Sequence, residues 1–127
     1  MANEISVSAS LGLSKGNVVN RILALASGVT FTQTGIRYAE GAQSVPTTAG
    51  GTILPLGPLA GATLGWCLLK NNDATNFVEI LTTISGTTIL KLKPGEIALF
   101  RFGSGVVAPA ALANTATCQL EFLILED

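Results

Sequence analysis

The chain has 127 residues, of which 12% are charged and 48% are hydrophobic, and its net charge at pH 7 is −1. A chain of this length builds one domain with one core, and an isolated soluble domain keeps about 25–35% of its surface charged. The low charge indicates that another subunit covers part of the surface, and the alternative is a neutral monomer coated with Thr and Ser. The seven basic residues are scattered and form no stripe, so the chain lacks the electrostatic footprint of a nucleic-acid-binding protein.

The beginning of the chain, MANEISVSAS, has an acid at Glu4 and no cationic segment that leads into an apolar run, so we expect no secretory signal. No run approaches the roughly 18 apolar residues of a membrane helix. We therefore expect folding in a reducing cytoplasm and no membrane partner. In that compartment Cys67 and Cys118, both in apolar strand-like segments, are predicted to be free buried thiols. A disulfide between them is the alternative and requires neighbouring strands.

Turn-forming residues recur about every eight to twelve positions, which is typical of an antiparallel sandwich or barrel. The first strand is predicted over 5–13, where apolar residues alternate with small polar ones. Segment 17–26, NVVNRILALA, fits one face of a helix as well as a strand, and the glycines that bound it favour the strand. VTFTQTG (29–35) predicts another strand, IRYAEG predicts a polar turn, and Pro46 predicts an edge strand or loop over 42–51.

From residue 64 onward the pattern predicts five strands, in LGWCLLKN, NFVEILTTI, TTILKLK, EIALFRF and ATCQLEFLIL. Lys93-Pro94-Gly95-Glu96 is typical of a type II turn, because Pro presets φ near −65° and Gly accepts a positive φ. We expect this turn to close a hairpin whose second strand is covered on both faces. The expected fold is all-β, a single antiparallel β-sandwich over 1–127 that is jelly-roll-like, with an immunoglobulin-like sandwich as the alternative. Residues 1–16 are a candidate N-terminal arm or edge strand.

The chain has no histidine, which excludes Ser-His-Asp and Cys-His catalysis and His-containing metal sites. Glu79 and Glu121 lie within strands and could share a glycosidase-like cleft. The simpler interpretation is that they are two solvated charges on strand faces. Asp73 is the sole carboxylate of NNDATN (71–76), so this segment is interpreted as a turn and not as a calcium loop. We therefore predict no catalytic, cofactor-binding or metal-binding residue and no enzyme activity.

Three aromatic residues are candidates for a sugar-stacking platform: Trp66, Tyr38 and Phe77. A platform requires them to be exposed together. A single Trp on an alternating apolar strand is more typical of a core.

Three segments, LKNNDATNFVEI, LKLKPGEIALFRF and the terminal EFLILED, together resemble small bacteriophage virion proteins. The resemblance is best over 64–127 and extends to ISVSASLGLSKG and YAEGAQSV. None of these motifs is catalytic, so the resemblance assigns no active-site residue. It implies a jelly-roll-like or immunoglobulin-like sandwich that occurs in many copies on a virus particle.

The low surface charge leads independently to self-association, and most assemblies are symmetric homo-oligomers. The leading hypothesis is a capsid decoration or cement protein of the virion, a homotrimer that binds the major capsid protein and stabilises its lattice. The predicted interface is the alternating segment 3–13, with Ile5, Val7 and Leu11, which would add to the sheet edge of another subunit. An ordinary first strand is the alternative for this segment. The other candidate functions are a tail or fibre component of the same particle and a carbohydrate-binding module.

Overall fold

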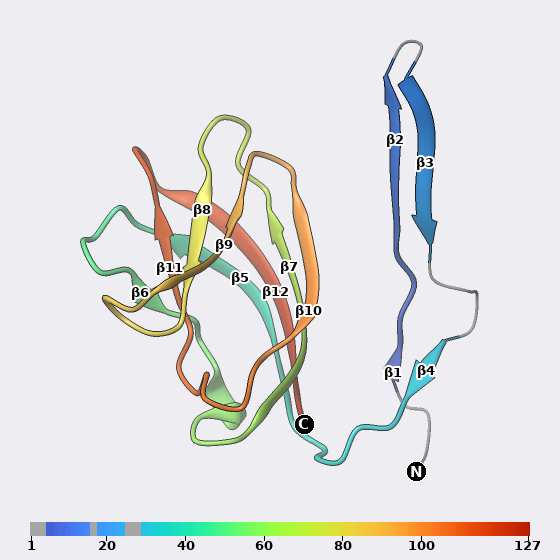
Figure 1. Ribbon diagram of the computed structural model, residues 1–127. Coiled ribbons are helices and arrows are strands. Elements are labelled where there is room, and N and C mark those ends of the chain that lie inside the picture. The colour runs from blue at the N-terminus through green and yellow to red at the C-terminus, as the bar shows by residue number, and fades with distance from the viewer. Residues whose placement is uncertain (1–4, 16–17, 25–28) are drawn as a thin grey trace. The chain divides into compact units, whose positions relative to one another are not determined.

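The computed structural model describes residues 5–15, 18–24 and 29–127 (Figure 1). The chain divides into two compact units, residues 1–34 and residues 35–127, named here the N-terminal unit and the sandwich unit. The strands of the two four-stranded sheets all lie after residue 34, and segment 1–16 belongs to a unit that extends to residue 34. That the two units act as one domain stays a prediction.

The described part of the N-terminal unit consists of two antiparallel ribbons. Strand β1 (Ile5–Ser6) pairs with β4 (Thr30–Phe31), and β2 (Ser10–Lys15) pairs with β3 (Val18–Ala24). The assignment of segment 17–26 as a strand is confirmed over β3, while residues 17 and 25–26 lie outside the described residues. The strand predicted over 29–35 is limited to β4.

The sandwich unit contains two four-stranded antiparallel sheets, which confirms the predicted all-β sandwich. We call β10-β7-β12-β5 the β12 sheet and β6-β11-β8-β9 the β8 sheet. Their order is compatible with both a jelly-roll-like and an immunoglobulin-like description. The elements are β5 (Tyr38–Val45), β6 (Thr52–Ile53), the 3-10 helix η1 (Gly57–Leu59), β7 (Leu64–Asn71), β8 (Val78–Leu81), β9 (Thr88–Leu92), β10 (Ile97–Arg101), β11 (Ala110–Ala113) and β12 (Cys118–Glu126).

The core lies between the inner faces of these sheets. Strand β12 alternates as the sequence predicts, with Leu120, Phe122 and Ile124 buried and Gln119 and Glu121 exposed. This period of two is what a strand requires when one face meets a core and the other does not. The inner face of β8 and the loop around η1 complete the packing with the fully buried Val78, Ile80, Leu54 and Leu59.

Two strands of the sandwich unit differ from expectation. The sequence IRYAEG predicts a turn, yet β5 begins at Tyr38 and runs for eight residues. It has few β-favouring residues and forms because it pairs along β12, from Val45 opposite Cys118 to Tyr38 opposite Leu125. The predicted connection GSGVVAPAALANT contains β11, which pairs with β6 on one side and with β8 on the other.

The Pro-Gly turn forms as predicted, but the predicted hairpin is wrong. The amide of Glu96 donates to the carbonyl oxygen of Lys93 at 3.0 Å, and Gly95 has a φ of 76°. Strand β9, however, pairs with β8, and β10 pairs with β7 in the other sheet (Figure 1). The turn therefore crosses between the sheets. Strand β10 is also not covered on both faces, because Ile97 is 64% exposed.

The two cysteines are free and buried, as predicted. The alternative disulfide requires Cα atoms within about 7 Å. Although β7 and β12 are neighbours, Cys67 pairs with Ile124, six residues along β12 from Cys118. At about 3.3 Å per residue this separates the two cysteines by about 20 Å.

Candidate interaction surfaces

The predicted interface residues lie in the N-terminal unit. Ile5 stands opposite Phe31 in the β1–β4 ribbon, and the amide of Val7 donates to the carbonyl oxygen of Val29 at 3.2 Å. Both Ile5 and Val7 are buried. Leu11 stands opposite Leu23 in the β2–β3 register. That these three residues contact another subunit stays a prediction.

The outer face of the β12 sheet carries an apolar row that sequence reasoning missed. Leu99, Leu68 and Leu123 are consecutive cross-strand partners on β10, β7 and β12. Leu68 is 40% exposed, and the other two are partly exposed. A wet sheet face normally presents polar residues at such positions. The alternation of LGWCLLKN places Leu68 on the face opposite the buried Cys67, so the sequence indicates that Leu68 faces outward.

The next row on the same outer face lies two residues further along each strand and contains two charged residues. Ile97, Lys70, Glu121 and Ala42 follow one another across β10, β7, β12 and β5. The Nδ2 of Asn72 donates to the Glu121 carboxylate at 2.6 Å. In the described part of the chain the ion pairs are Arg37–Glu126 and Arg101–Asp127, so neither Lys70 nor Glu121 belongs to one.

A shallow hollow of about 590 Å³ lies on this same face. It forms where β5 presents small residues beside the longer side chains of β7 and β12. Its lining consists of Glu40, Gly41, Ala42, Leu68, Lys70, Glu121, Phe122 and Leu123. The face therefore combines a protruding edge at Ile97 with a hollow at the opposite edge strand.

The three aromatic residues are only partly brought together. Trp66 lies on the outer face of β7, half-buried rather than in the core, with the Arg101 guanidinium carbon 5.8 Å from its ring centroid. Tyr38 is 54% exposed on β5 of the same sheet. Phe77 precedes β8, and the Lys91 Nζ lies 4.1 Å from its ring centroid.

The carboxylates considered for catalysis do not meet. Glu121 lies on the outer face of the β12 sheet, whereas Glu79 pairs with Lys91 on the outer face of the β8 sheet. The core separates them, as expected for two solvated strand charges. Among the described residues, no group of three or more His, Cys, Asp and Glu side chains could hold a metal ion.

The NNDATN segment is a turn closed by its own side chains. The Asp73 carboxylate accepts from the amides of Asn76 at 2.5 Å and Thr75 at 2.7 Å, which lowers its pKa. Asn71 is fully buried, and its Nδ2 donates to the carbonyl oxygens of Asn76, Leu92 and Lys93 at 2.9, 3.1 and 3.2 Å. The turn's polar atoms are thus used internally, which supports the interpretation as a turn.

Asn71 also explains why the Pro-Gly turn leads to the β12 sheet. Its amide donates to the Glu96 carbonyl oxygen at 2.9 Å, and its own carbonyl oxygen accepts from Gly95 at 3.0 Å. These bonds pair the chain after the turn with the end of β7. Sequence reasoning did not single out Asn71, although alternation from Cys67 and Leu69 places it on the inner face.

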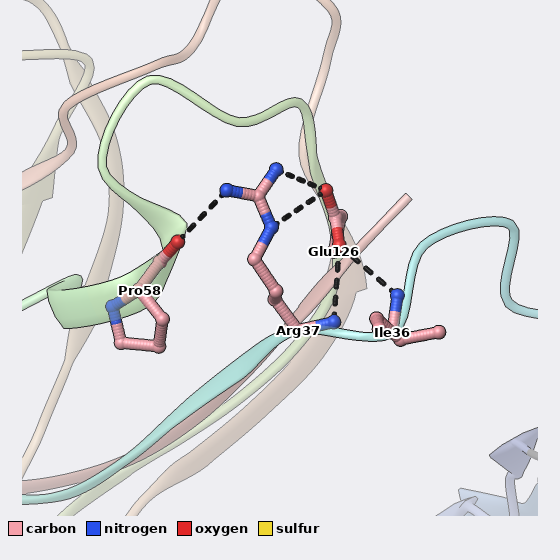
Figure 2. Close-up of polar contacts among 4 residues, drawn as sticks. All are labelled: Ile36, Arg37, Pro58 and Glu126. Carbon is pink, nitrogen blue, oxygen red and sulfur yellow. Dashed lines mark hydrogen bonds and ion pairs between the residues drawn. The ribbon is translucent and has the colours of Figure 1, made fainter.

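The chain enters the sandwich unit through a cluster of polar contacts (Figure 2). The Glu126 carboxylate accepts from the amides of Ile36 and Arg37, both at 3.0 Å, and forms an ion pair with the Arg37 guanidinium. The Arg37 Nη1 also donates to the carbonyl oxygen of Pro58 at 3.1 Å. The hydrogen bond from the Arg37 side chain is the main cause that lowers the pKa of Glu126 to about 2.

The thiols are not suited to nucleophilic chemistry. Burial raises the pKa of Cys67 to about 12. Burial, and then the charge of Asp73, raise the pKa of Cys118. A raised pKa leaves little of the reactive thiolate at neutral pH.

Comparison with protein-family models, with curated proteins and with solved structures gave no significant match. The described residues contain no helix long and apolar enough to cross a membrane.

Proposed function

We propose that the chain is a structural protein of a bacteriophage virion, a capsid decoration or cement protein that binds the major capsid protein and stabilises its lattice. The observation that supports this proposal is the make-up of the N-terminal unit, whose described strands form only two-stranded ribbons. A two-stranded ribbon is marginally stable in water and requires a further packing surface. In a virion, neighbouring subunits supply that surface, and the chain associates as a homotrimer.

The bound state stabilises the shell by mass action, because a ligand that binds only the mature lattice shifts the equilibrium toward it. The segment with Ile5, Val7 and Leu11 contributes strand pairing at the contact. The sandwich unit provides a folded body with its own core. The low charged fraction of 12% agrees with a surface that is covered in the assembly.

The test is co-sedimentation of the purified chain with empty heads assembled from the major capsid protein of the same virus. We expect saturable binding at a fixed ratio to capsid subunits and a higher melting temperature of decorated heads. Light scattering of the chain alone checks the homotrimer. Binding to tails but not to heads would move the chain to a tail or fibre role, and binding to neither would contradict the proposal.

A carbohydrate-binding module remains the second candidate, because Trp66 and Tyr38 share the outer face of the β12 sheet. Sugars stack on exposed aromatic rings. Titration with oligosaccharides while Trp66 fluorescence is recorded separates the two functions. A saturable spectral shift supports the module, and an unchanged spectrum counts against it.

A further inference from the structure

The outer face of the β12 sheet is self-complementary in charge. Lys70 on β7 and Glu121 on β12 are cross-strand partners, one on each side of the line that separates these two central strands. A two-fold axis along that line brings Lys70 of one copy opposite Glu121 of the other, and the reverse. It also brings Leu68 opposite Leu123 of the other copy. A two-fold contact has this property, in that each residue pair occurs twice.

The same face is self-complementary in shape. The two-fold axis carries edge strand β10 over edge strand β5 of the other copy. Ile97, which is 64% exposed, then lies over Ala42, which lines the hollow of about 590 Å³. Sheets that pack face to face keep their strands within about 30° of each other, which agrees with an axis along the strands.

We propose that the outer face of the β12 sheet binds the same face of a second copy of this chain, about a two-fold axis between β7 and β12. Four strands about 4.8 Å apart give a face on the order of 400 Å². That is below the roughly 800 Å² that each partner buries in a standard interface. The pairing is therefore reversible and grows with concentration. It is independent of the proposed function, and it doubles the mass of whichever species the chain otherwise forms.

Two charge reversals test the contact in the full chain. Lys70→Glu gives each of the two copies two acidic residues at the axis, and Glu121→Lys gives each copy two basic ones. Each variant alone is expected to raise the dissociation constant of the pairing at least 10-fold, because like charges then face each other. Sedimentation velocity over a range of concentrations measures this constant. An equimolar mixture of the two variants is expected to recover the pairing, since the acidic face of one copy meets the basic face of the other. No effect within a single chain can produce recovery in the mixture.

The β8 sheet offers a matched control. Glu79 and Lys91 are also cross-strand partners on an outer face, so Lys91→Glu and Glu79→Lys change the same charges on the other side of the sandwich. These variants are expected to leave the doubling unchanged. An equal loss in the control variants, or no recovery in the mixture, would overturn the proposal.

Cross-linking tests the geometry. Ala42 and Ile97 are on opposite edge strands, three strand spacings or about 14 Å apart within one chain, so cysteines there cannot bridge internally. The double variant Ala42→Cys/Ile97→Cys is expected to form oxidised dimers, and either single variant is not. Equal cross-linking by a single variant would contradict the axis. A wild-type chain that never doubles, up to millimolar concentration, would likewise overturn the proposal.

Discussion

Asn71 is the one buried polar residue of the described chain, and it connects three segments. Its side chain donates to carbonyl oxygens of the loop at Asn76 and of the crossover at Leu92 and Lys93. Its Oδ1 accepts from the amide of Asp73 at 3.0 Å. A buried amide with its bonds satisfied specifies one arrangement, because any other leaves polar groups unpaired.

Asn71→Ala is expected to lower the free energy of unfolding by about 3 kcal/mol, because it leaves buried carbonyl groups without a donor. Urea unfolding followed by circular dichroism measures the change. The neighbouring Asn72→Ala is the control, since it removes only a solvent-exposed hydrogen bond to Glu121 and should cost no more than about 1 kcal/mol. Similar losses for both variants would show that Asn71 does not connect the segments as described.

The ion pair of Glu126 makes the stability of the sandwich unit depend on pH. Its folded pKa, about 2, lies below the ordinary 4.5, so its contribution to stability is present above pH 4.5 and is lost as the pH falls toward 2. Unfolding of the wild type and of Glu126→Gln is therefore expected to differ most at neutral pH and to converge below pH 3. Glu40→Gln, on an exposed position of β5, controls for the loss of one charge. A difference that is the same at pH 2 and pH 7 would refute the role of the ion pair.

At the scale of elements, the turn between β9 and β10 depends on Gly95. A Cβ added there meets no atom within 4 Å, so the cost of Gly95→Ala comes from its φ of 76° alone. We expect a loss of about 1 kcal/mol in urea unfolding. Gly103 has equally open surroundings without a positive φ, and Gly103→Ala is expected to be neutral or slightly stabilising. Equal effects of the two substitutions would contradict this explanation.

The strands after residue 64, apart from β11, could be predicted because their alternation is regular and turn residues separate them. The sequence of β5 is poor in β-favouring residues, and its strand conformation comes from pairing with β12, which no local pattern reveals. Pro94 and Gly95 are sufficient to predict the turn, but they do not determine which sheet the next strand joins. Alternation reveals that Leu68 faces outward, but its alignment with Leu99 and Leu123 depends on the register of three strands, which comes from tertiary structure.

At the scale of the whole molecule, the two units are expected to differ in local stability. Amides of β12 lie in the centre of a four-stranded sheet, whereas those of β1 and β4 belong to a ribbon of two strands. Hydrogen exchange of the free chain should therefore be slowest in β12 and fast in β1 and β4. Assembly on a particle is expected to slow exchange in the N-terminal unit far more than in β12. Strong protection of β1 in a confirmed monomer would contradict the need for an external surface.

The position of β12 has a consequence for how the protein is made. It is the strand that joins β5 to β7, and it follows both in the chain, by more than seventy residues in the case of β5. Such distant pairing slows folding, because loop closure costs entropy before the contacts form. A chain truncated before Cys118 lacks the strand that joins β5 to β7, so its β12 sheet cannot form. Without β12, β5 has no partner in the sheet, and β7 keeps only β10.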